Sequence, residues 1–262
     1  MITQIFKDDT TYREHKLHRL KLFLIGLYVI LTFNFLLLTC LYSQGGKFIF
    51  SQLQYAGGWD TRPTAWDRIS EYLLTTTSIK SIPERRIIKP NDEILFWSPF
   101  IVIAGSNDIL KLNDSEIHTL KRYIICGGMI FIDDSSGKKG YGFDKEIREI
   151  IKKISPENPI EKIPINDAIF KSFYLLKSVS GRIITNRYLE GCKIGERYSI
   201  IYSQNDLFGA WEKDNLGNYI YPCNEQQRWE AKKLLLNIIL YSLTGTYKSD
   251  TIHKSFIQNK LK

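Results

Sequence analysis

The chain has 262 residues, of which 44% are hydrophobic and 13% aromatic, so it can bury a sizeable core and is not a disordered chain. Its net charge is +8, but much of the excess lies near the two ends and no nucleic-acid motif occurs, which argues against nucleic-acid binding. The four cysteines form no C-x-x-C pair, which argues against a zinc or thioredoxin-type site.

An uncharged run from Leu22 to Tyr42 is long enough to span a bilayer, so we expect residues 22–43 to form a transmembrane helix or signal sequence. Basic residues crowd the segment before it. The positive-inside rule therefore keeps residues 1–21 in the cytoplasm and predicts a single-pass inner-membrane protein with its domain in the periplasm. A cleaved signal peptide would instead give a secreted periplasmic protein, and lipidation of Cys40 would give a lipoprotein. All three alternatives export the domain.

The next part of the chain alternates strands with helices. Alternating or continuous apolar runs predict strands at residues 48–55, 87–88, 100–104, 129–132 and 198–202. Helical spacing and caps predict helices from Pro63 to Leu73, over one or two turns at 92–97, from Asn113 or Asp114 to Gly127, at 144–154, and at 225–244 up to Gly245.

This order predicts an α/β fold with a mostly parallel sheet and helices on both faces. We find neither an internal repeat nor a low-complexity linker, so residues 47–247 are interpreted as one domain. Residues 248–262 form a basic tail. Residues 156–190 are mixed and contain three prolines, so no element is assigned to them.

Polar side chains follow several of the predicted strands. In an open α/β sheet, ligands bind at the carboxyl ends of the strands, so we expect these side chains to converge on one rim. The candidate rim consists of Asp60, Arg62, Ser106, Asn107, Asp108, Asp133, Asp134, Asn205, Asp206 and Trp211.

The adjacent carboxylates Asp133 and Asp134 repel unless something neutralises them, and they are the candidate metal ligands. The charge of the pair could be neutralised by Lys138, Lys139, Arg62 or a divalent metal ion. The alternative is that such residues only form turns and cap helices, which is the simpler interpretation of Asp108 and Asp206.

Nucleophilic catalysis lacks its usual parts. The chain has no G-x-S-x-G elbow, and the one histidine within the domain, His118, lies on a predicted helix. It also has no phosphate loop and no G-x-G-x-x-G motif, so we predict no cofactor. Cys126 is expected to be a small buried hydrophobe, whereas Cys192 and Cys223 could form a disulfide in an exported domain.

Several separated motifs resemble a bacterial family called domain of unknown function 4159. The motifs are FSQLQYAGGWDTRP, PFIVIAGSNDILKLNDSEIHTLKRYIICGGMIFIDDSS, DAIFKSFYLL, IIYSQNDLFGAWE and NIILYSLTG, in that order, over roughly residues 48–245. The resemblance implies a flavodoxin-like fold of the class I glutamine amidotransferase type. It also implies an envelope location and operons that encode a MoxR-type ATPase and von Willebrand factor A-like proteins.

Two departures from the family pattern bear on chemistry. Many relatives have a Gly-His-Gly turn where this chain has Gly105-Ser106-Asn107, and the amidotransferase nucleophile has no counterpart because the third core strand ends in Asp133-Asp134. Both favour a non-catalytic, membrane-tethered binding or assembly module that works with the MoxR and von Willebrand factor A proteins. The alternative is a metal-assisted hydrolase that uses the Asp-rich rim.

Overall fold

The computed structural model describes residues 47–106 and 110–248, and seven strands in these residues form one mixed sheet. The strand order is β2-β1-β3-β4-β7-β6-β5, in which the first five strands run parallel and β6 runs antiparallel to both of its neighbours, β7 and β5. The bounds are β1 Ser51–Leu53, β2 Arg86–Ile88, β3 Phe100–Gly105, β4 Met129–Asp134, β5 Glu161–Lys162, β6 Glu190–Ile194 and β7 Arg197–Ser203. The predicted α/β class with a mostly parallel sheet is confirmed.

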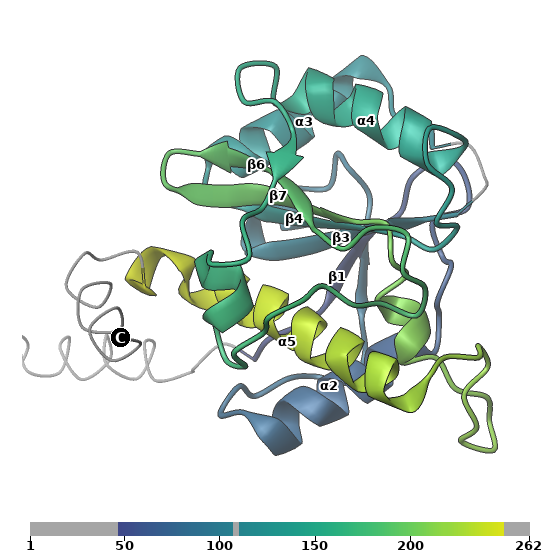
Figure 1. Cartoon of the computed structure of the whole chain (residues 1–262). Coiled ribbons are helices and arrows are strands. Elements are labelled where there is room, and N and C mark those ends of the chain that lie inside the picture. Colours follow the sequence, from purple (N-terminus) through teal and green to yellow (C-terminus); the bar gives the residue numbers. More distant parts are fainter. Residues whose placement is uncertain (1–46, 107–109, 249–262) are drawn as a thin grey trace, which may run out of the picture. The chain divides into compact units, whose positions relative to one another are not determined.

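Helices cover both faces of this sheet, as predicted. Figure 1 shows α3 and α4 above the strands, and α2 and α5 below them. The helices are α2 Ala65–Thr76, α3 Asp114–Ile125, α4 Phe143–Ile154 and α5 Glu225–Lys248, with short 3-10 helices η1 Glu93–Trp97, η2 Ala168–Lys171 and η3 Phe208–Ala210.

The two central strands, β3 and β4, explain why the sequence forms a sheet that is covered on both sides. All six residues of each strand are buried. Because side chains alternate along a strand, Phe131 enters the core under α2 and α5, whereas Ile130 and Ile132 enter the core under α3 and α4. A continuous apolar run is the expected sequence of such a strand.

Local sequence sets the start of α3. Asn113 caps α3, because its side chain accepts from the backbone N–H of Glu116 while the Glu116 carboxylate accepts from the N–H of Asn113. The predicted end of α5 at Gly245 is wrong, since the helix continues to Lys248. A single glycine weakens a helix but does not oblige it to stop.

The structure differs from the sequence analysis in three further respects. Strand β6 was not predicted; it begins at Glu190 and makes an antiparallel edge hairpin with β7, a pairing that periodicity within a short polar segment does not indicate. Cys126 is exposed rather than buried, because it sits at the C-cap of α3 beyond the last core-facing turn. Cys192 and Cys223 are both free thiols, so they do not form a disulfide.

The predicted membrane segment at 22–43 and the tail at 249–262 lie outside the described residues. Among residues 47–106 and 110–248, no helix is both long enough and apolar enough to cross a membrane.

Candidate functional site

The carboxyl ends of the parallel strands meet at one edge of the sheet, and α5 begins at the same edge (Figure 1). Three of the predicted residues lie together there: Arg62 from the loop after β1, Asp133 at the end of β4, and Asp206 after β7. Arg182 and Glu212 join them from other loops. We call these five residues the strand-end cluster.

Asp206 is the centre of the strand-end cluster, and its side chain is completely buried. Arg62 binds it in a bidentate manner, with Nε 3.0 Å from Oδ1 and Nη2 2.8 Å from Oδ2. The Nε of Arg182 donates a second ion-pair hydrogen bond to Oδ2. One carboxylate therefore holds two guanidinium groups, and a fourth donor, the N–H of Gly209, lies 3.1 Å from Oδ1.

The backbone around Asp206 holds this carboxylate in place. Asp206 has φ of 51°, in the left-handed region that aspartate and asparagine tolerate better than most residues. A Cβ at Gly209 would lie 2.1 Å from the Asp206 Oδ2, so only glycine leaves room for the carboxylate. The N–H of Asp206 also donates to the Asp134 carbonyl at 3.2 Å, which ties the loop to β4.

Arg182 is held in place by α5 and by the loop after β7. The side-chain amide of Gln227 on α5 donates to the carbonyls of Gly181 and Arg182, at 2.7 and 2.8 Å. The N–H of Arg182 donates to the carbonyl of Asp206 at 3.3 Å. These bonds fix the backbone that carries the Arg182 side chain, and the guanidinium Nη2 itself donates to the carbonyl of Ser135 at 3.4 Å.

Arg62 has contacts on every side. Its Nη1 donates to the carbonyl of Thr61 at 3.0 Å, and its Cζ lies 4.0 Å from the centre of the Tyr221 ring, a cation–π geometry. Glu212 approaches within 3.7 Å of Nε. Burial acts to lower the pKa of Arg62, but the hydrogen bonds and charge of Asp206 outweigh it, so the pKa is raised and the residue stays charged.

Asp133 is fully occupied by backbone donors. Its two oxygens accept from the N–H groups of Leu207 and Phe208, each at 3.0 Å, at the start of η3. Burial and the nearby charge of Asp206 raise the pKa of Asp133 to about 7, against these hydrogen bonds and Arg62, which lower it. When Asp133 is protonated, the cluster contains two arginines facing two carboxylates.

Asp134 points to the opposite face of the sheet, because neighbouring residues of a strand alternate. Its Oδ1 accepts from the N–H and hydroxyl of Ser136, at 2.8 and 2.7 Å, while Oδ2 is buried with no hydrogen-bond partner among the described residues. Burial, with the charge of Asp144 on α4, raises its pKa. The structure does not bring Asp133 and Asp134 together as two ligands of one ion.

The other predicted rim residues lie elsewhere. Asp60 pairs with Arg85 at 2.6 and 2.7 Å near the β1–β2 edge, and Trp211 is buried with its ring centre 5.2 Å from that of Tyr72. Asn205 accepts from the N–H groups of residues 185 and 186 at 3.0 and 2.9 Å, which fixes a loop. Ser106 is half-buried after β3, whereas Asn107 and Asp108 lie outside the described residues.

Arg182, Glu212 and Tyr221 belong to the site but were missed by the sequence analysis. Arg182 lies in the mixed segment at 156–190, to which no element was assigned. An arginine in a loop is ordinary on a protein surface, so nothing local distinguishes it. Glu212 directly follows Trp211, the last residue of the predicted rim, which was the one available signal.

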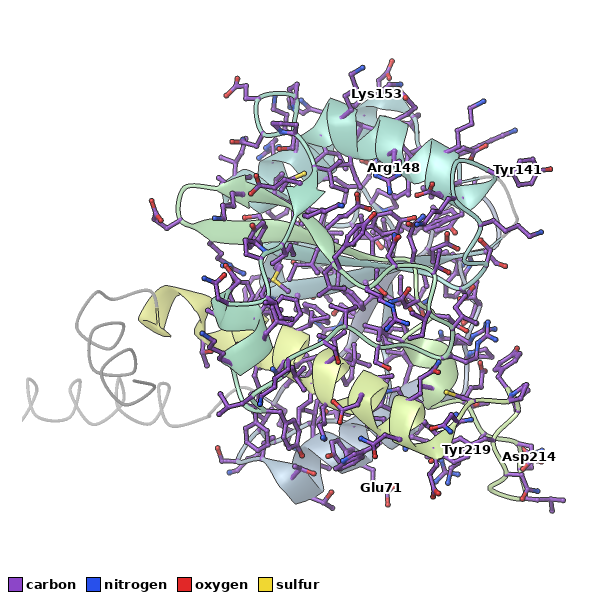
Figure 2. All side chains as sticks on the ribbon, in the orientation of Figure 1. Glu71, Tyr141, Arg148, Lys153, Asp214 and Tyr219 are labelled. Carbon is purple, nitrogen blue, oxygen red and sulfur yellow. The ribbon has the colours of Figure 1, made fainter. Side chains whose placement is uncertain are left out.

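Asp206 and Asp133 are both engaged by other groups of the same chain. The carboxylates that α/β enzymes would direct at a ligand are here bound by arginines and backbone N–H groups of the same chain. Among residues 47–106 and 110–248, no three His, Cys, Asp or Glu side chains gather closely enough to hold a metal ion. Figure 2 shows Asp214 and Tyr219 in the loop after η3, which projects beyond the cluster into solvent.

These features define an α/β domain in which the carboxyl ends of the parallel strands are closed by an internal ion cluster. The family model described as Domain of unknown function (DUF4159) matches residues 49–243, which is most of the chain, so the protein belongs to this family. A search of curated proteins gave no match.

Proposed function

We propose that this protein is a membrane-tethered envelope module that binds or assembles with other proteins and carries out no reaction at its strand ends. The strand-end cluster is the observation that supports this most strongly. Asp206 is saturated by Arg62, Arg182 and Gly209, so it has no free oxygen lone pair directed toward solvent. A general base or a nucleophile needs such access to its substrate.

The metal-assisted hydrolase is the second candidate. Asp134 favours it, because one of its carboxylate oxygens is buried and unpartnered and such an atom is costly unless something binds it. Calorimetric titration of the full chain with Mg²⁺, Ca²⁺, Mn²⁺ and Zn²⁺ separates the two proposals. We expect no binding heat that depends on these carboxylates. Heat that disappears in the Asp133→Asn/Asp134→Asn variant would place a metal there and favour the hydrolase.

For the fold, we propose the flavodoxin-like class. The five parallel strands have the order β2-β1-β3-β4-β7, which corresponds to the order 2-1-3-4-5 of that class. The departure is the link from β2 to β3, which contains only the short helix η1 in place of a full crossover helix. The antiparallel hairpin of β6 and β5 extends the sheet on the far side of β7.

For location and partners, we propose an inner-membrane anchor at residues 22–43, a periplasmic domain, and association with MoxR-type and von Willebrand factor A proteins. The uncharged run after a basic segment supports the anchor. Protease added to spheroplasts should digest the domain while an intact cytoplasmic marker survives. Protection of the domain would contradict the topology. Co-purification of the protein with MoxR-type and von Willebrand factor A-like proteins tests the assembly role.

A further inference from the structure

Large apolar side chains are exposed at the amino ends of the strands, opposite the strand-end cluster. They come from η1 and from the last turn of α3. The exposed fractions are 83% for Trp97, 62% for Ile125, 42% for Ile94 and 41% for Phe96. We call these four residues the amino-end patch.

Two of the four patch residues share one hollow. Phe96 and Trp97 line a hollow of about 230 Å³ together with Cys126, the residue that follows Ile125. The Phe96 ring centre lies 6.2 Å from that of Tyr123. Single exposed apolar residues are normal, but two exposed aromatic side chains that line one hollow mark a surface that something covers.

The chain enters the domain beside this patch. The Phe48 ring centre lies 6.3 Å from that of Phe100, and the hydroxyl of Ser51 lies 2.9 Å from that of Ser98. The first described residues therefore run alongside the segment that carries Trp97. Figure 1 shows that α5 also ends on this side of the domain.

The sequence limits how far this end of the domain can lie from a membrane anchor. Four residues, Ser43 to Gly46, separate the uncharged run from Lys47. At about 3.5 Å per extended residue, this link reaches roughly 17 Å at most. If the run spans a bilayer, the side of the domain that contains Lys47 must stay close to the headgroups.

We propose that the amino-end patch rests in the interfacial region of the bilayer that anchors the chain, so that the strand-end cluster faces away from the membrane. This inference depends on the proposed membrane anchor. Tryptophan is the residue type that prefers the interface, where its ring is apolar and its N–H stays wet. The exposed cations Lys47 and Lys80 flank the first residues, and Arg122 lies 5.6 Å over the Phe96 ring, where anionic headgroups would meet them.

The test compares the patch with an equally exposed apolar residue on the other side. Leu216, in the loop after η3, is 87% exposed and serves as the matched control. A Cys40→Ala/Cys126→Ser/Cys223→Ser background of the full chain receives one new cysteine, Trp97→Cys or Leu216→Cys, and an environment-sensitive fluorophore. Cys192 stays unlabelled because it is buried. Each chain is reconstituted in phosphatidylethanolamine–phosphatidylglycerol vesicles that contain spin-labelled lipid.

Lipid quenching at position 97 should exceed that at position 216 roughly fivefold or more, because a patch at the interface lies within about 10 Å of the acyl chains. Equal quenching at the two positions in chains that stay in vesicles after an alkaline wash would overturn this inference alone. Loss of the chain in that wash would overturn the anchor and the inference together. A label at 97 that is shielded from water but not quenched by lipid would assign the patch to a protein, a second copy included.

As a check without cysteines, brominated lipid should quench the native protein more than the Trp97→Phe variant. Because Trp97 is the most exposed tryptophan among the described residues, the difference between the two reports on the patch. Identical quenching of the two proteins would contradict the proposal.

Discussion

The two ends of the sheet differ in which kinds of side chain they bury and which they expose to solvent. At the carboxyl ends, charged side chains are withdrawn from solvent and paired with one another, as in the double ion pair on Asp206. At the amino ends, apolar side chains are presented to solvent, as in Trp97. Polar residues in the sequence therefore do not identify the exposed surface of this fold. Charged side chains at the carboxyl ends are buried, whereas aromatic side chains at the amino ends are exposed.

The largest change in unfolding free energy is expected for a substitution of Asp206. The Asp206→Asn substitution keeps the shape and the tolerance for a positive φ but removes the counter-charge of two buried arginines. Breaking a buried pair in this way costs about 3 to 5 kcal/mol of unfolding free energy. Urea denaturation measures it. The exposed Glu157→Gln should change stability by less than about 0.5 kcal/mol, and a similarly small effect at Asp206 would mean that the cluster is not structural.

The second effect is a pH dependence set by Asp133. Its pKa is raised to about 7, so the folded chain binds this proton more tightly than the unfolded chain, where an aspartate has a pKa of about 3.9. The unfolding free energy therefore falls as the pH rises from about 4 to about 7, by at most about 1.4 kcal/mol per pH unit, and this contribution is flat above that.

The measurement is a series of urea midpoints across that pH range for the wild type and for Asp133→Asn. The variant should show a shallower slope in this window, and the slope that remains comes from Asp134 and Glu212, whose pKa values burial also raises. The variant also loses one of the two acceptors for the N–H groups of Leu207 and Phe208. Parallel profiles in the two proteins would show that Asp133 keeps an ordinary affinity for its proton.

The third prediction is that Trp97→Ala changes the unfolding free energy only slightly. Trp97→Ala removes the largest side chain of the amino-end patch, but that side chain is 83% exposed and contributes little to the core. We expect a change of less than about 0.5 kcal/mol in detergent, equal to that of the control Leu216→Ala. A loss of several kcal/mol would mean that Trp97 stabilises the fold and is not free to rest on a bilayer.

The smallest effect concerns the thiols and should not change stability at all. Cys126 at the edge of the patch is exposed, so maleimide should modify it in the native protein. Cys192 should react only after unfolding, since it is buried and burial raises its pKa to about 12. Mass spectrometry of labelled peptides distinguishes the two sites, and rapid native labelling of Cys192 would contradict the packing of β6.

Much of the fold could be predicted because its signals are local. The apolar runs of β3 and β4 and the cap of α3 at Asn113 are each contained within a few residues. Strand β6 could not be predicted, because its pairing with β7 depends on the sheet that already exists and not on its own pattern.

The sequence identified several residues of the candidate site but not which of them pair with one another. Asp133, Asp206 and Arg62 were identified, but the partner of Asp206 lies 144 residues away in Arg62, and Arg182 came from a segment without periodicity. Asp133 and Asp134 point in opposite directions because side chains alternate along a strand. The sequence analysis could have used this rule, but it treated the two adjacent charges as one pair. Ion pairs over such separations are products of the fold, so only their members are visible in the sequence.

The strand-end carboxylates serve as counter-ions of the protein's own arginines. A double-mutant cycle on Asp206→Asn and Arg62→Met, measured by urea denaturation of the full chain, tests this claim most directly. We predict a favourable coupling of about 2 kcal/mol or more, so that the double variant is less destabilised than the sum of the single variants. Additive losses, within about 0.5 kcal/mol, would contradict the claim and return these carboxylates to the list of residues available for a ligand.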